Sequence, residues 1–198
     1  MRASVSGRGN DEGVNRADYA EDLAVGERAE DDFIEYQKRV AGIALEKWHH
    51  EGIEPLRLDT IRCYVMPTTV TPPDLYDPEA ERRIEVKWRY HAMFYFNMEQ
   101  FYFRMSRQKW ASYVFLDQTE MPCFIALVVE SEKPSASDIA TAEKLGREVP
   151  SVYPSGLFKG RVRFLDRMVN YDNDWAWVPM EALAKVTTIE NYRRVLER

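Results

Sequence analysis

The sequence predicts an α/β (α+β) fold in which a mixed central sheet is flanked by helices. Three patterns predict this fold. Apolar residues recur at helical spacing after Gly26, apolar and polar residues alternate over residues 84–89, and residues 122–129 form an almost unbroken apolar run. Such a run is typical of a strand that is buried on both faces, so other elements should cover both sides of the sheet.

The N-terminal part of the chain predicts an arm, a helix and a strand. Residues 1–16 combine glycines with polar residues, so we expect a disordered arm followed by a single domain over residues 17–198. Helical spacing begins near Phe33 and continues through Val40, Ile43, Ala44 and Trp48. Residues 55–65 then alternate as a first strand.

A hairpin is expected next. Its turn is Asp77-Pro78-Glu79, since these residue types favour turns, and the preceding strand carries Asp74. In the returning strand, Glu85 and Lys87 share one face, while the apolar side chains at 84, 86 and 88 occupy the other. Two carboxylates and one amine can therefore meet in one cleft.

Later elements follow from caps and periodicity. Ser106 is a predicted N-cap for a helix over residues 107–113. The expectations beyond it are a buried strand at 122–129, a helix at 137–145 inside a surface excursion, a strand at 157–165, an edge strand at 174–179, a short helix from 179 and a terminal helix at 189–196.

The hairpin residues predict a metal site. Two carboxylates suit Mg²⁺, which takes one or two protein carboxylates and keeps other positions for phosphate oxygens and water. Lys87 would neutralise charge that develops on a phosphate, or orient the water. Asp77 is an alternative to Asp74, because the strand after Asp74 is soon interrupted by a charged run.

The literal segments Pro73-Asp74 and Glu85-Val86-Lys87 resemble the PD-(D/E)XK nuclease superfamily. The resemblance implies a restriction-endonuclease-like core, as in Holliday-junction resolvases, with αβββαβ order and C-terminal strand and helix additions. It implies a deoxyribonuclease that depends on Mg²⁺ or Mn²⁺. Asp74, Glu85 and the Val86 carbonyl would hold the metal, Lys87 would assist attack by water, and Glu30 would lie in the outer site.

The same resemblance draws attention to Gln108 with Tyr113, a glutamine–tyrosine pair on the helix after the active strand. Glu30 fits the family by lying four residues after Gly26 in the N-terminal helix. Glu27 is a weaker candidate for that position.

The distribution of charged and aromatic residues indicates which parts of the chain could contact DNA. The net charge is −6, but the acidity is concentrated in residues 1–60, so the remainder can present basic clusters to a phosphate backbone. The expected nucleic-acid contacts are Arg89, Arg107, Gln108 and Lys109. Aromatic residues gather at 90–96 and 101–103, where they favour core or homodimer packing over stacking on bases.

Other classes of protein are less well supported. Cys63 and Cys123 have apolar neighbours, so buried reduced thiols and a cytoplasmic setting are expected. No stretch is long and apolar enough to span a bilayer, and there is no phosphate-binding glycine loop. Two alternatives stay open: a catalytically inactive nuclease-fold module for nucleic-acid binding or protein assembly, and an unrelated α+β protein with a chance motif.

Overall fold

The computed structural model describes residues 16–48, 70–172 and 174–198. The expected strand at 55–65, Cys63 and all but the last residue of the expected arm lie outside them. Arg16, placed in the arm by the sequence, is the first residue of a helix.

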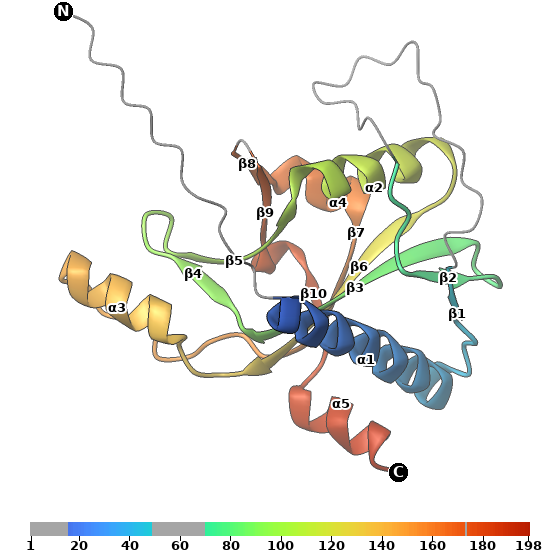
Figure 1. The fold of residues 1–198 in the computed structure, drawn as a ribbon, viewed down its shortest axis with the longest axis horizontal. Coiled ribbons are helices and arrows are strands. Elements are labelled where there is room, and N and C mark those ends of the chain that lie inside the picture. The colour runs from blue at the N-terminus through green and yellow to red at the C-terminus, as the bar shows by residue number, and fades with distance from the viewer. Residues whose placement is uncertain (1–15, 49–69, 173) are drawn as a thin grey trace, which may run out of the picture.

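A mixed six-stranded sheet forms the centre of the structure, with helices on both faces, which confirms the predicted fold (Figure 1). Its strand order is β1-β2-β3-β6-β7-β10, and β3 and β6 are parallel while the other pairs are antiparallel. The bounds are β1 (Glu46–Lys47), β2 (Leu75–Asp77), β3 (Arg82–His91), β6 (Cys123–Ser131), β7 (Gly156–Arg161) and β10 (Ala184–Thr187).

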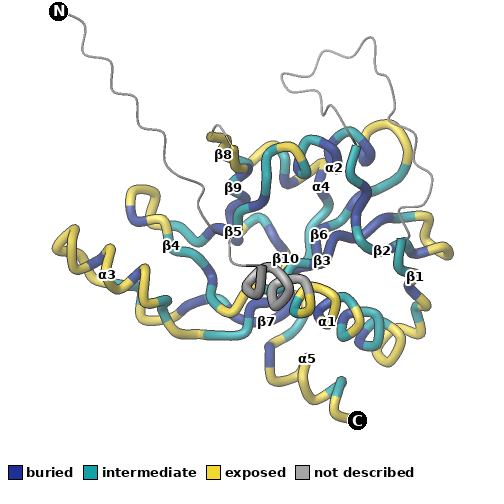
Figure 2. The backbone as a smooth tube through the Cα atoms, in the orientation of Figure 1, coloured by how far each residue is buried: buried dark blue, intermediate teal, exposed yellow. Residues whose placement is uncertain are grey.

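Most residues of the central strand β6 are buried (Figure 2). They alternate between two hydrophobic clusters, so both faces of the strand are covered. Ile125 and Leu127 pack with helices α2 (Arg107–Thr119) and α4 (Val162–Leu165). Ala126 and Val128 pack with α1 (Arg16–Ala41) and α5 (Ile189–Leu196). Each fully buried large apolar side chain stabilises the fold by roughly 1.5–3 kcal/mol. The apolar run predicted from the sequence is thus the middle layer of the protein.

Helix α1 ends earlier than its apolar spacing predicted. Gly42 adopts a left-handed conformation with φ of 70°, and its N–H donates to the Lys38 carbonyl at 3.0 Å, which terminates the helix. Ile43 still packs against the apolar cluster beneath α1, whereas Val40 is 57% exposed. The helical pattern extended through Trp48 was therefore wrong beyond Ala41.

The predicted hairpin between β2 and β3 is confirmed. The Asp77 carboxylate accepts hydrogen bonds from the Ala80 N–H at 3.1 Å and from the Arg82 side chain at 2.8 Å. An aspartate that bonds its own turn is a common way to stabilise a tight reversal. The turn sets the antiparallel register in which Leu75 faces Ile84.

A second sheet extends from one end of the first and leads into α2. Its order is β4-β5-β9-β8, with β4 (Met93–Tyr95), β5 (Gln100–Ser106), β9 (Trp175–Pro179) and β8 (Asn170–Tyr171). Ser106 ends β5 and caps α2, because its hydroxyl accepts from the Lys109 N–H at 3.3 Å, as predicted. Strand β5 therefore determines where the first turn of α2 lies.

Two C-terminal expectations need correction. The strand expected at 157–165 stops at Arg161, where α4 begins, because Val162 and Leu165 are buried on one side of a helical turn while Phe164 is 60% exposed. Strand β9 is not an edge strand, since it pairs with both β5 and β8. The helices α3 (Ala136–Leu145) and α5 agree with the sequence. No helix in the described part of the chain is long and apolar enough to cross a membrane.

Candidate metal and phosphodiester site

Strand β3 carries Glu85 and Lys87 on the face that α2 covers. The alternation of the strand sends Ile84 and Val86 into the cluster beneath α1, so Glu85 must point to the other side. Its side chain is fully buried. A carboxylate without solvent needs compensating charge and hydrogen bonds, so its neighbours define the site.

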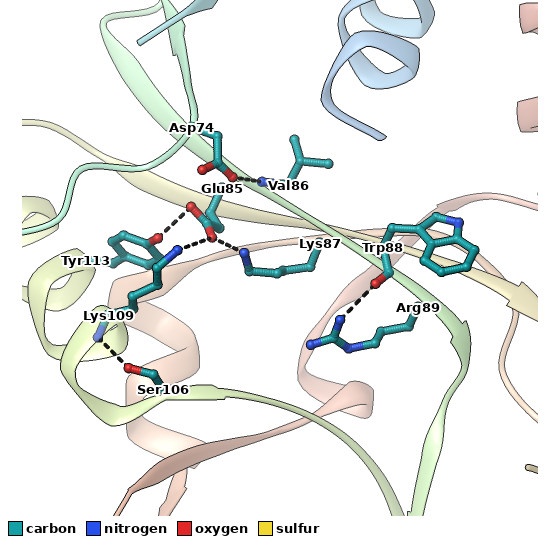
Figure 3. A network of polar contacts seen from close by, with 9 residues as sticks. All are labelled: Asp74, Glu85, Val86, Lys87, Trp88, Arg89, Ser106, Lys109 and Tyr113. Atoms are coloured by element: carbon teal, nitrogen blue, oxygen red, sulfur yellow. Dashed lines mark hydrogen bonds and ion pairs between the residues drawn. The ribbon is translucent and has the colours of Figure 1, made fainter. Parts of the chain in front are cut away.

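Glu85 is surrounded by two ammonium groups and one hydroxyl (Figure 3). The Lys87 ammonium pairs with its Oε1, and the Lys109 ammonium lies 4.0 Å from the same oxygen. The Tyr113 hydroxyl donates to Oε2 at 2.5 Å. Burial raises the pKa of Glu85, but Lys87 and Lys109 outweigh it, so the pKa is lowered and the group is a carboxylate.

The same burial and charge act on the partners of Glu85. Burial lowers the pKa of Lys87, yet the charges of Glu85 and Asp74 raise it above its ordinary value. Burial and the Glu85 charge both raise the pKa of Tyr113. Lys87 therefore remains an ammonium ion and Tyr113 remains a hydrogen-bond donor.

Asp74 meets Glu85 from the segment just before β2. Its Oδ2 accepts from the Val86 N–H at 3.3 Å. Burial and then the charge of Glu85 raise the pKa of Asp74 from 3.8 to about 8. The two carboxyl groups thus lie close enough to compete for one proton, which is the condition under which a divalent cation would stabilise both.

Geometry distinguishes the two candidate aspartates. Asp77 is buried and pairs with Arg82 at 2.7 Å while it holds the hairpin turn. Asp74 shares its surroundings with Glu85 and Lys87. Of the two aspartates, only Asp74 lies beside the Glu85 side chain.

Glu30 approaches from α1, on the edge of this group. Its carboxylate lies 3.9 Å from the Lys47 ammonium on β1. Burial is the largest effect and raises the pKa of Glu30 above its ordinary value. The Lys47 charge opposes this rise, and the charges of Glu85 and Lys87 have smaller effects. Glu30 is thus near the carboxylates but is bound most closely to Lys47.

The expected nucleic-acid contacts occupy different positions. Lys109 lies at the carboxylates, while Arg89 is exposed and stands apart from them, with its guanidinium donating to the Trp88 carbonyl at 3.1 Å (Figure 3). Gln108 is exposed on α2. Arg107 donates to the Asp172 carbonyl at 3.2 Å, so it belongs to the second sheet rather than to the carboxylate pair.

Sequence reasoning underestimated the contribution of α2 to the site. Lys109 was assigned to DNA contact and Tyr113 only to a glutamine–tyrosine pair. The two residues are four positions apart, so they share one face of the helix, and both reach Glu85. This four-residue spacing is the sequence signal that the two side chains share one face of α2.

The side chains around Glu85 include oxygen donors of the kind that a hard divalent cation prefers. Across residues 16–48, 70–172 and 174–198, no three His, Cys, Asp or Glu side chains gather in a group that could hold a metal ion. Asp74 and Glu85 supply two carboxylates, and Mg²⁺ commonly needs no more than that from protein side chains. In addition, Glu85 Oε1 is buried and makes no well-aligned hydrogen bond in spite of its ion pairs.

The Val86 backbone points to the same place. Its N–H is directed at Asp74, and the N–H and C=O of one residue in an extended strand project to the same side. The Val86 carbonyl is therefore on the Asp74 side of β3. Two carboxylates, one carbonyl and water are a ligand set that fits Mg²⁺ or Mn²⁺.

Comparison with known proteins finds similarity among solved structures. No protein-family model matches the chain. No curated protein matches it either. The chain is similar to the Archaeoglobus fulgidus Holliday junction resolvase Hjc, with a TM-score of 0.44, 15% sequence identity, and coverage of 81% of this chain and 96% of the resolvase. This similarity is too low to carry an argument about activity.

Proposed function

We propose that this protein is a Mg²⁺-dependent nuclease that hydrolyses phosphodiester bonds in DNA. The observation that carries the proposal is the convergence of Asp74 and Glu85 beside the Lys87 ammonium on one side of β3. Asp74, Glu85 and the Val86 carbonyl would hold the cation. When bound there, Mg²⁺ would lower the pKa of a coordinated water and neutralise charge on the phosphate.

The residues of the chain have separate tasks in this proposal. Lys87 stabilises the charge that develops on the phosphate, because its pKa keeps it protonated beside the carboxylates. Tyr113 fixes the orientation of the buried Glu85 carboxylate through their hydrogen bond. Lys109, which is partly exposed, provides a second positive charge at the rim. Glu30 would belong to an outer position of the site.

DNA would approach over the N-terminal turn of α2, where Lys109 and Gln108 lie, with Arg89 and Arg107 at the periphery. Counterion release from such contacts favours binding. We also propose a homodimer and a reducing, cytoplasmic setting, and the buried free thiol of Cys123 is compatible with the latter.

Cleavage of DNA by four variants tests the proposal. Glu85→Gln removes a charge that holds the metal, and Lys87→Ala removes the cation beside the phosphate; each should lower the cleavage rate by on the order of 10²–10³. Matched controls are Glu143→Gln and Lys144→Ala, which make the same changes on the exposed surface of α3. Single-stranded, duplex and four-way-junction DNA would be incubated with Mg²⁺, Mn²⁺ or EDTA.

The expected result is cleavage by the parent protein and both controls that EDTA abolishes. Circular dichroism and a urea melt establish that the two active-site variants are folded. Cleavage undiminished in folded Glu85→Gln would show that the site lies elsewhere. If the parent protein binds DNA but cuts none with Mg²⁺ or Mn²⁺, the hypothesis of a catalytically inactive binding module replaces that of a nuclease.

A further inference from the structure

A second concave site lies on the small sheet, away from the carboxylates. It has a volume of about 420 Å³, within the range of small-molecule pockets. Four aromatic rings line it: Tyr95, Tyr102, Tyr171 and Trp177. Strands β4, β5, β8 and β9 each contribute one of them. Aromatic side chains that line a hollow on a hydrogen-bonded sheet are held in place before any ligand arrives.

The rings are arranged to receive a flat partner. Tyr95 and Trp177 have centroids 5.9 Å apart and are tilted by 46°, so neither ring covers the face of the other. Tyr95 and Tyr171 are 45% and 46% exposed, although aromatic rings ordinarily gain from burial. The Arg107 guanidinium lies over one face of Tyr171, so a nucleobase would stack on the exposed parts of the Tyr95 and Tyr171 rings.

Two arginines flank the aromatic wall, although neither lines the pocket itself. The Arg104 guanidinium lies 4.4 Å from the Trp175 ring and 5.7 Å from the Trp177 ring. The Arg107 guanidinium lies 5.5 Å from the Tyr171 ring. Two guanidinium groups beside the aromatic wall would attract phosphate and repel a cation.

The carboxylate of Asp172, which lines the pocket, already accepts hydrogen bonds from the protein itself. Asp172 accepts hydrogen bonds from the Trp177 indole N–H at 2.7 Å, from the Trp175 N–H at 2.7 Å and from the Asp174 N–H at 3.0 Å. Those bonds hold the loop between β8 and β9. Asp172 is thus part of the pocket wall rather than a counter-charge for an ammonium ligand.

The pocket is joined to the carboxylate site through α2. The Arg107 N–H donates to the Asp174 carbonyl at 2.9 Å, which ties the first residue of α2 to the pocket loop. Two residues further on, Lys109 reaches Glu85. A nucleic-acid strand that crosses the first turn of α2 can therefore contact both sites.

We infer that this aromatic pocket takes an unstacked nucleobase of the strand that occupies the carboxylate site, so the substrate is DNA with an unpaired nucleotide. Bases within a duplex are stacked and paired, and their faces are not available to the rings without extrusion. Single-stranded DNA should bind more tightly than duplex for this reason. The inference rests on the proposed nuclease function for the identity of the bound strand.

Binding is measured in EDTA, so that cleavage is not required. Fluorescence anisotropy compares labelled oligothymidine with a duplex of equal length. The variants are Tyr95→Ala and Tyr171→Ala, with Tyr95→Phe to retain the ring and Tyr90→Ala as the matched control. Tyr90 is a tyrosine of β3 that is 54% exposed and does not line the pocket.

Each alanine variant should weaken binding to oligothymidine by about 5- to 150-fold, the effect of one lost base stack. Tyr95→Phe and Tyr90→Ala should bind as the parent protein does, and duplex affinity should change little. Equal affinity of the parent protein for the two DNA forms would overturn the inference, as would pocket variants that behave like Tyr90→Ala.

Two further outcomes separate the possible failures. If the pocket variants change the oligomeric state in sedimentation together with DNA affinity, the pocket is an interface between two copies of the chain and the inference falls. If pocket-dependent binding persists but the parent protein cuts no DNA, the nuclease function fails while the base site stands in a binding module.

Discussion

Replacing Asp74 by asparagine should make the metal-free protein more stable near pH 8 and have little effect at low pH. An unfolded aspartate loses its proton near pH 3.8, whereas burial and Glu85 raise the pKa of Asp74 in the folded protein to about 8. Folding is therefore favoured by this group below pH 3.8, and that contribution is lost progressively as the pH rises to about 8. Asparagine resembles the protonated acid and cannot lose a proton, so it avoids this loss.

The magnitude follows from the change in proton affinity. Each tenfold change is worth about 1.4 kcal/mol, so a pKa raised from 3.8 to about 8 corresponds to roughly 6 kcal/mol. Water entry and side-chain relaxation reduce such differences, and we expect a gain of about 2–4 kcal/mol in the free energy of unfolding.

Urea denaturation in EDTA, repeated from below pH 3.8 to above pH 8, measures the effect. The matched control is Asp77→Asn, which removes the charge that pairs with Arg82 and should destabilise the protein by about 1–3 kcal/mol. A stability difference between Asp74→Asn and the parent protein that stays constant over this range would refute the account of the Asp74–Glu85 pair. So would a loss of stability in Asp74→Asn at pH 8.

Three other predictions concern the surroundings of the site. Tyr113→Phe removes a hydrogen bond to the buried Glu85 carboxylate, so the free energy of unfolding should fall by about 1.5–3 kcal/mol in urea; an unchanged value would exclude that bond. Asp117→Ala removes a buried carboxylate that pairs with Arg161 and accepts from the Cys123 N–H, so the free energy of unfolding should fall by about 1.5–3 kcal/mol, measured in the same way; an unchanged value would contradict this. Millimolar Mg²⁺ should raise the melting temperature of the parent protein more than that of Asp74→Asn, because ligands that bind only the folded state stabilise it, and equal shifts would count against a site at Asp74.

Local patterns were sufficient to predict much of the fold. The alternation around Glu85 placed that residue and Lys87 on one face of β3, and the residue types at Asp77 predicted the hairpin. Ser106 marked the start of α2 because N-capping depends on neighbours in sequence. These features are short in range, so a single sequence contains the information that determines them.

Predictions failed where one pattern fitted two structures. Val162 and Leu165 are three residues apart, which suits one side of a helix, yet the segment around them also alternates as a strand. Helical spacing likewise continued beyond Ala41, although Gly42 ends α1. In both places a backbone turn decided between the alternatives.

Contacts between residues far apart in the sequence were the part of the site that was hardest to predict. The positive charges that keep Glu85 ionised come from Lys87 on the same strand and from Lys109 on α2. The sequence placed Lys109 among basic residues for DNA. Its spacing to Tyr113 indicates that the two share a helix face, but not that β5 and its cap direct this face toward Glu85. Burial and pairing of this kind depend on the assembled sheet and helix.

Crystals of the protein grown with single-stranded DNA and Mn²⁺ offer the most direct test of the metal-dependent site. The account predicts an anomalous difference peak within about 2–2.5 Å of oxygen atoms from both Asp74 and Glu85, next to a phosphate. Bound DNA with no Mn²⁺ peak between these two carboxylates, or with Mn²⁺ held by other residues, would contradict it.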